Sequence, residues 1–152
     1  MRRKLGLLQA HASDETLALD LHRLMQEQTV DFTLCFRCLT EAANGEETPL
    51  RALFREPDVL DAWLRRWRQR LAREATSPDR RLDTMRRANP VYIPRNHKVE
   101  EALEAAVTRG DYRSLRRLLA VLSDPFRARP GQQAWEDPAP PSFGPYRTFC
   151  GT

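Results

Sequence analysis

Glycine is scarce in this sequence, with six glycines against 11 prolines in 152 residues. Neither a glycine-rich dinucleotide-binding fingerprint nor a Walker phosphate loop is present, so the commonest nucleotide-binding turns are excluded. No apolar run approaches the roughly 20 residues that a membrane-spanning helix needs. The basic start Met1–Lys4 precedes an apolar stretch that is too short for a signal peptide. We therefore expect a cytoplasmic protein that makes no membrane contact.

Lysine is nearly absent as well, because 23 of the 25 basic residues are arginine and only Lys4 and Lys98 are lysine. The 21 acidic residues are interleaved with the arginines and leave a net charge of +4. Such mixing is typical of solvated, salt-bridged helix faces rather than of a nucleic-acid footprint. Arginine enrichment alone is also compatible with phosphate or carboxylate recognition.

One stretch departs from this balance. Residues 51–87 carry eleven arginines against six acids, together with Trp63 and Trp67. Phosphate contacts and base stacking could use such a mixture. Both tryptophans fall on a predicted core stripe, however, so we do not expect a nucleic-acid partner. A free-standing helical interaction module that binds nucleic acid through the Arg65–Arg87 surface stays as the alternative interpretation.

Apolar residues recur at helical spacing through the first 123 residues, which predicts an all-α fold. Caps and breakers such as Asp31, Gly45 and Pro57 delimit the helices. The predicted helices cover about 14–28, 31–44, 57–73, 78–88, 96–109 and 111–122. Residues 44–49 are expected to form a loop, and Asn96 to cap a helix. The last two helices are predicted to form a tight hairpin over residues 96–122, with Leu103 and Leu119 in its core.

The last 29 residues, 124–152, have a different character. They contain six of the prolines and five of the twelve aromatic residues. Proline density argues against helix and central strand, whereas disordered tails are poor in aromatic residues. We expect a helical region over 1–123, followed by an extended, proline-rich tail over 124–152 that aromatic rings anchor to a surface.

Three cysteines rule out a disulfide-rich scaffold. Cys35 and Cys38 form a lone C-x-x-C inside a predicted helix, which favours buried structural thiols over a metal or redox site. Cys150 lies third from the end beside basic residues, and sequence chemistry alone leaves open an incidental or a reactive thiol. Neither a Ser–His–Asp arrangement nor a kinase motif is present. The residues themselves therefore predict no catalytic, cofactor or metal site.

Several longer strings resemble one family. They are Met1–Leu7 (MRRKLGL), Asp31–Thr33 (DFT), Asn89–Asn96 (NPVYIPRN), Val99–Ala106 (VEEALEAA) and Tyr146–Thr152 (YRTFCGT). Together they resemble the C-terminal region of the selenoprotein O family, also called SelO or YdiU. The resemblance covers essentially the whole chain, and it implies the C-terminal helical lobe of a protein-kinase-like fold. Family members are protein adenylyltransferases, which move AMP from ATP to serine, threonine or tyrosine hydroxyls of proteins.

The resemblance also implies what this chain lacks. The family's catalytic, nucleotide and magnesium residues lie in a larger N-terminal part, so ATP and Mg²⁺ are expected for the full-length protein only. Cys150 matches the family's C-terminal cysteine, which is thought to be redox-active and to pair with a cysteine of the catalytic part. The expected partners are the missing N-terminal kinase-like lobe and the protein substrates of the whole enzyme. We expect Met1 to be an internal methionine, and the chain alone to be inactive and to expose apolar surface.

Overall fold

The computed structural model describes residues 1–144, and over these residues the fold is all-α, as predicted. It has seven α-helices and four short 3-10 helices in this range, and no strand. The chain divides into two compact units, Met1–Pro90 and Val91–Thr152. The composition changes near residue 124, but the contacts group the described tail residues with the preceding helical hairpin.

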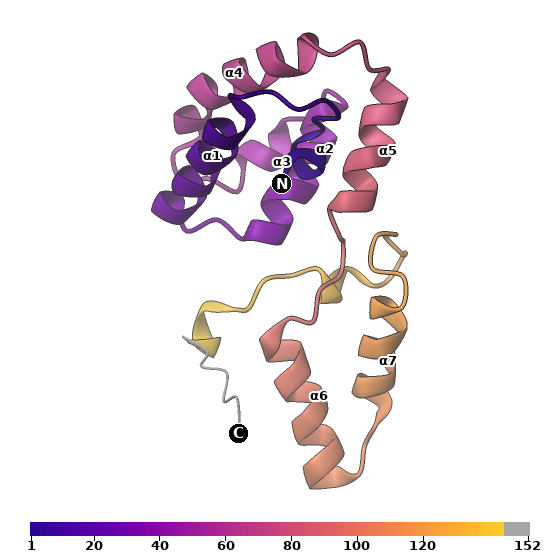
Figure 1. Cartoon of the computed structure of the whole chain (residues 1–152). Helices are drawn as coiled ribbons and strands as arrows, with labels where there is room; N and C mark the ends of the chain where they lie inside the picture. The colour runs from indigo at the N-terminus through magenta and orange to yellow at the C-terminus, as the bar shows by residue number, and fades with distance from the viewer. Residues whose placement is uncertain (145–152) are drawn as a thin grey trace. The chain divides into compact units, whose positions relative to one another are not determined.

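The first unit is a cluster of helices around the N-terminal segment (Figure 1). Helix α1 packs against α4, and the 3-10 helix η1 packs against α1, α2 and α5. The elements of this unit are η1 (Arg2–Leu5), α1 (Asp14–Gln28), α2 (Phe32–Ala43), α3 (Thr48–Arg51), η2 (Pro57–Val59), α4 (Leu60–Ala72) and α5 (Pro78–Ala88).

Local signals explain most of these boundaries. The Asp31 carboxylate caps α2 by accepting a hydrogen bond from the Leu34 amide at 2.9 Å. Ser77 caps α5 in the same way. The expected loop over 44–49 is wrong in its last two residues, because α3 begins at Thr48 and Pro49 fixes its first turn. Pro57 opens a 3-10 turn, and α4 itself starts at Leu60.

Trp63 and Trp67 form the centre of the first unit's core. Each is 1% exposed, and their rings stack with centroids 5.7 Å apart. The indole Nε1 of Trp63 donates to the Leu17 carbonyl at 2.8 Å, and that of Trp67 donates to the Leu5 carbonyl at 2.9 Å. Because each buried N–H has an acceptor, both rings are buried without an unpaired polar group.

The second unit contains the predicted hairpin, with α6 (Asn96–Arg109) packed against α7 (Arg113–Leu122). Gly110 ends α6 at a φ of +63° and donates its amide to the Ala106 carbonyl. Arg95, not Asn96, is the N-cap of α6; Asn96 is the first helical residue, so the expected cap is one residue off.

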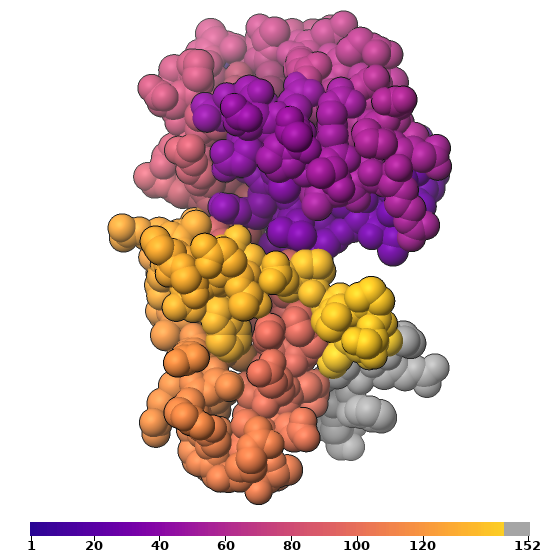
Figure 2. All heavy atoms as spheres, turned by 180° about the vertical axis from the view of Figure 1, so that it is seen from behind, coloured from indigo at the N-terminus to yellow at the C-terminus, as the bar shows by residue number. Residues whose placement is uncertain are grey.

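The second unit has a small hydrophobic core of its own. It is formed by Val91, Tyr92, Leu118 and Val121, with Trp135 packed on it. Figures 1 and 2 show the described tail, which includes η3 (Gln133–Trp135) and η4 (Pro141–Phe143), running across the start of α6 and the end of α7.

Backbone hydrogen bonds fix this tail to the segment before α6. The amides of Val91 and Tyr92 both donate to the Pro125 carbonyl, at 2.7 and 3.1 Å. The Arg129 amide donates to the Tyr92 hydroxyl at 2.9 Å. Phe126, in contrast, is 43% exposed, so the predicted aromatic anchoring does not extend to that ring.

Candidate functional site

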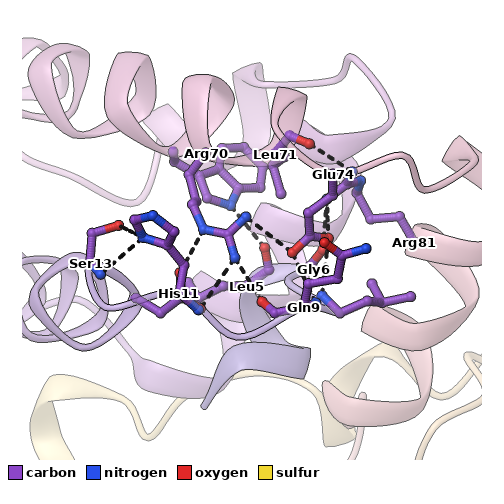
Figure 3. A network of polar contacts seen from close by, with 12 residues as sticks. Leu5, Gly6, Gln9, His11, Ser13, Arg70, Leu71, Glu74 and Arg81 are labelled. Atoms are coloured by element: carbon purple, nitrogen blue, oxygen red, sulfur yellow. Dashed lines mark hydrogen bonds and ion pairs between the residues drawn. The ribbon is translucent and has the colours of Figure 1, made fainter.

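The most deeply buried charged groups of the first unit form one network (Figure 3). Arg70, near the end of α4, lies 2.7 Å from the Asp14 carboxylate through Nε and 3.1 Å from the Glu74 carboxylate through Nη1. Arg81 of α5 lies 3.7 Å from the other oxygen of Glu74. All four residues are less than 9% exposed. Two guanidinium groups and two carboxylates therefore compensate one another where water is excluded.

The same network binds the backbone of the N-terminal segment. The two carboxylate oxygens of Glu74 accept hydrogen bonds from the amides of Leu8 and Gln9, at 3.1 and 3.0 Å. The Nη2 atom of Arg70 donates to the Gln9 carbonyl at 2.7 Å. Backbone groups that no helix could satisfy thus find charged partners.

Arg81 makes a similar contact with the backbone three residues earlier in the segment. Its Nη1 atom donates to the Gly6 carbonyl at 2.7 Å, and its Nη2 atom donates to the Leu71 carbonyl at 3.0 Å. Gly6 has a φ of +72°, and a Cβ atom there would lie 2.7 Å from the Met85 sulfur. The position therefore requires glycine for both its backbone conformation and its close packing.

The electrostatics of the network indicate a structural role. Burial by itself would raise the pKa of Asp14, but hydrogen bonds from Arg70 and from the His11 amide outweigh it and hold the pKa below its ordinary value. The hydrogen bond to Asp14 raises the pKa of Arg70. A carboxylate that stays ionised and saturated with donors is not a general base. The network positions the N-terminal segment.

The sequence pattern grouped Arg70 with the solvated arginines of its helix, and the structure places it in the interior. A signal was nevertheless present. Trp63, Trp67, Arg70 and Glu74 follow a spacing of four, three and four residues, so the two charged residues continue the tryptophan stripe. Charged residues on the apolar face of a helix indicate a buried ion pair.

A second polar cluster joins the N-terminal string of the resemblance to the string that begins at Asn89. The Asn89 Nδ2 atom donates to the Lys4 carbonyl at 3.1 Å and to the Thr40 hydroxyl at 3.0 Å. The Lys4 Nζ atom donates to the Ala88 carbonyl at 2.8 Å and lies 5.4 Å from the centroid of the Phe36 ring. The two strings, 85 residues apart, are therefore in direct contact.

The sequence predicts structural thiols at Cys35 and Cys38 and a candidate redox thiol at Cys150. Cys35 is buried in α2, and burial raises the pKa of its thiol to about 12. Burial also raises the pKa of Cys38. Cys35 is buried as expected, whereas Cys38 is half-buried. Cys150, the candidate redox residue, lies outside the described residues.

Residues 1–144 contain no group of three or more His, Cys, Asp or Glu side chains placed to hold a metal ion. Within this range, no helix has both the length and the apolar character that crossing a lipid bilayer requires.

Part of the arginine-rich stretch is buried or paired, whereas Arg65, Arg73, Arg80 and Arg86 are exposed and have no side-chain partner within residues 1–144. Trp63 and Trp67 are buried, so neither ring can stack on a base in this fold. Arg66 pairs with Asp20 at 2.8 Å, and Arg68 pairs with Glu47. Arg66, Arg68 and the buried Arg70 and Arg81 are thus engaged within the fold, which reduces the charge that the alternative interpretation can use.

The hairpin exposes apolar side chains that the sequence pattern assigned to its core. Leu103 and Leu119 are 45% and 59% exposed, so the prediction that they are buried is wrong. Val107 on α6 and Tyr112 before α7 are exposed too. Helices α6 and α7 and the described tail cover only one side of each other within the second unit. The rest of the apolar stripe on each helix has no covering element among the described residues.

Comparisons with known proteins place this arrangement in a family. The family model "Protein adenylyltransferase SelO" matches residues 1–123. Curated relatives named protein nucleotidyltransferase YdiU are 46% identical in Rhizobium johnstonii, 51% in Cereibacter sphaeroides and 47% in Geobacillus kaustophilus. Each match covers 100% of this chain but only 30–31% of the relative. The chain thus spans about a third of the length of these relatives, and it belongs to the SelO family of protein adenylyltransferases.

Proposed function

We propose that this chain is the C-terminal helical part of a longer SelO-type protein adenylyltransferase. The whole protein transfers AMP from ATP, with Mg²⁺, to serine, threonine or tyrosine hydroxyls of target proteins. The match of the full chain to about a third of each YdiU relative supports this proposal. Nucleotidyl transfer needs metal ions and phosphate-binding groups held in position, and in this proposal the remaining two thirds of the protein supply them.

The role of this chain is then to buttress the catalytic part. The observation that carries this role is the exposed apolar surface of the hairpin, on Leu103, Val107 and Leu119. Solvent-exposed apolar side chains grouped on neighbouring helices are typical of a surface that another part of the protein covers. The buried ion network serves the same role, because it holds the N-terminal segment, through which the chain connects to the catalytic part, against α4 and α5.

Cys150 serves as a redox switch in this proposal. Its thiol and a thiol of the catalytic part form a disulfide when a peroxide accepts their two electrons and two protons, and a dithiol reductant reverses the reaction. Replacing Cys150 with Ser in the longer protein should make AMP transfer equally fast under oxidising and reducing conditions. If the redox dependence of the unmodified protein persists in Cys150→Ser, the switch is elsewhere.

The first experiment is to measure the size of the native polypeptide in its source cells, by immunoblotting and intact mass spectrometry. A product much larger than 17.6 kDa is expected. A product of 17.6 kDa contradicts the proposal and favours a free-standing helical interaction module.

The second experiment tests the docking surface. The residues that precede this chain in the longer product are coexpressed with the tagged 152-residue chain, and copurification is measured. The double variant Leu103→Glu/Leu119→Glu should abolish copurification, because each carboxylate would have to be buried without a partner. Leu19→Glu is the matched control, since Leu19 is also an exposed leucine on a helix, at 61%. Equal losses in the two proteins would show that the hairpin is not the docking surface.

A further inference from the structure

The first unit contains a hollow that the ion network and the core do not use. It has a volume of about 580 Å³ and lies between the N-terminal segment and α5. Four arginines contribute to its lining, which consists of Arg2, Arg3, Leu7, Leu8, Arg80, Asp83, Thr84, Arg87 and Ala88. This size is within the range of small-molecule sites in proteins, about 300–1,000 Å³.

The charges around this hollow are unbalanced. Asp83 is the acidic residue of the lining, and it is paired with Arg87 at 3.1 Å. Arg2, Arg3 and Arg80 make no side-chain ion pair or hydrogen bond within residues 1–144. Three guanidinium groups thus face one hollow without a compensating carboxylate, whereas Arg70 and Arg81 of the same unit are paired.

The backbone that carries these arginines is firmly held. On one side, the Leu5 carbonyl binds Trp67 and the Gly6 carbonyl binds Arg81. On the other side, Leu82 and Met85 anchor α5 in the interior. The fold therefore fixes the backbone positions from which the three guanidinium groups extend, so no backbone rearrangement is needed to bring them to one ligand.

We propose that this hollow binds the polyphosphate group of a small molecule such as pyrophosphate or a nucleoside triphosphate. A guanidinium group forms paired, charge-assisted hydrogen bonds with phosphate oxygens. An anion with several negative charges relieves the repulsion among three cations, and a singly charged anion relieves less of it. The site is built entirely from residues of this chain, so the inference does not depend on the proposed function of the longer protein.

The test is isothermal titration calorimetry of the 152-residue chain with sodium pyrophosphate at low ionic strength. Binding with one ligand per chain is expected. The double variant Arg3→Gln/Arg80→Gln should raise the Kd by at least about tenfold, because it removes two charge-assisted contacts. The matched control is Arg65→Gln/Arg86→Gln, which removes the same charge from exposed positions outside the hollow. It should change the Kd by less than about twofold, the size of a distant charge effect in salt.

Further titrations identify the source of the phosphate group. Equal affinities for ATP and pyrophosphate would show that the phosphates alone are recognised, and a tighter ATP complex would show that the hollow also holds the nucleoside. Binding of adenosine without phosphates would overturn the proposal. So would equal weakening in the two double variants, or the absence of binding by the unmodified chain. Circular dichroism of each variant confirms that it is folded.

Discussion

The Nε atom of Arg70 lies 2.7 Å from a carboxylate oxygen of Asp14, a residue 56 positions earlier in the chain. The two side chains are 6% and 5% exposed, so the pair is shielded from water. It joins the end of α4 to the start of α1. A buried ion pair of this kind adds little net stability to the fold, because desolvation offsets the attraction between its charges. The loss of one partner, however, leaves an uncompensated charge in the interior.

Replacing Asp14 with Asn should therefore be strongly destabilising. We expect the free energy of unfolding in urea to fall by about 3–5 kcal/mol, the usual cost of breaking a buried ion pair. The control is Asp83→Asn, which breaks the exposed pair with Arg87 and should cost less than about 1 kcal/mol. Equal losses in the free energy of unfolding of the two variants would contradict the burial of the Asp14–Arg70 pair.

The pKa of Asp14 also predicts the response to acid. Because its pKa in the folded state is held below the ordinary value of 3.8, the ionised carboxylate stabilises the fold above that value. This contribution is lost as the pH falls through the folded-state pKa. Between about pH 5 and pH 2, the free energy of unfolding should fall more steeply for the unmodified chain than for Asp14→Asn. Denaturant titrations at several pH values measure both slopes, and parallel slopes would refute the assignment.

Gly6 provides a test of close packing. Alanine at this position should lower the free energy of unfolding by about 2–4 kcal/mol, since a left-handed conformation and a crowded Cβ both add cost. Gly45→Ala is the matched control, because Gly45 also has a positive φ, +98°, but has nothing within 4 Å of the added Cβ. It should show only the conformational cost, about 1–2 kcal/mol. If both alanine variants lose the same free energy of unfolding, the Met85 side chain moves aside without an energetic cost.

Burial of Cys35 predicts low reactivity. The thiolate is the nucleophile, and a thiol with a pKa of about 12 is almost entirely protonated at pH 8. Iodoacetamide should therefore label Cys35 in the unfolded chain and not in the native one, as peptide mass spectrometry would show. The experiment is best done on Cys150→Ser, so that the C-terminal thiol does not exchange disulfides with the others. Equal labelling rates in native and unfolded protein would contradict the structure.

The exposed hairpin leucines should bind hydrophobic dyes. The unmodified chain is expected to raise the fluorescence of an environment-sensitive dye, and Leu103→Glu/Leu119→Glu should remove much of that signal. Leu19→Glu serves as the control for a single exposed leucine elsewhere. A dye-silent, strictly monomeric chain would count against an uncovered apolar surface.

The helices were predictable because their signals are local. The spacing of apolar residues located α1 and the hairpin, and the side chains of Asp31 and Ser77 marked the starts of α2 and α5. The buried state of Arg70 was not predictable in the same way, because it depends on Asp14, which is distant in the sequence. Its place on the tryptophan stripe was the available clue.

The leucines of the hairpin show a different limit. Periodicity identifies the apolar face of a helix, but it does not say whether another element covers that face. Leu118 and Leu119 are neighbours on α7, and they are 5% and 59% exposed. The hollow with three unpaired arginines was invisible for a similar reason, since Arg3 and Arg80 meet only after the chain has folded.

The contacts between the ion network and the N-terminal segment have an evolutionary consequence. Arg70, Glu74 and Arg81 bind carbonyl and amide groups of Gly6, Leu8 and Gln9, and none of these bonds involves a side chain of the segment. These bonds therefore place no constraint on which side chains stand at positions 8 and 9. An insertion or deletion between Gly6 and Gln9 would move these groups out of register, so the network constrains the length of this segment more than its composition.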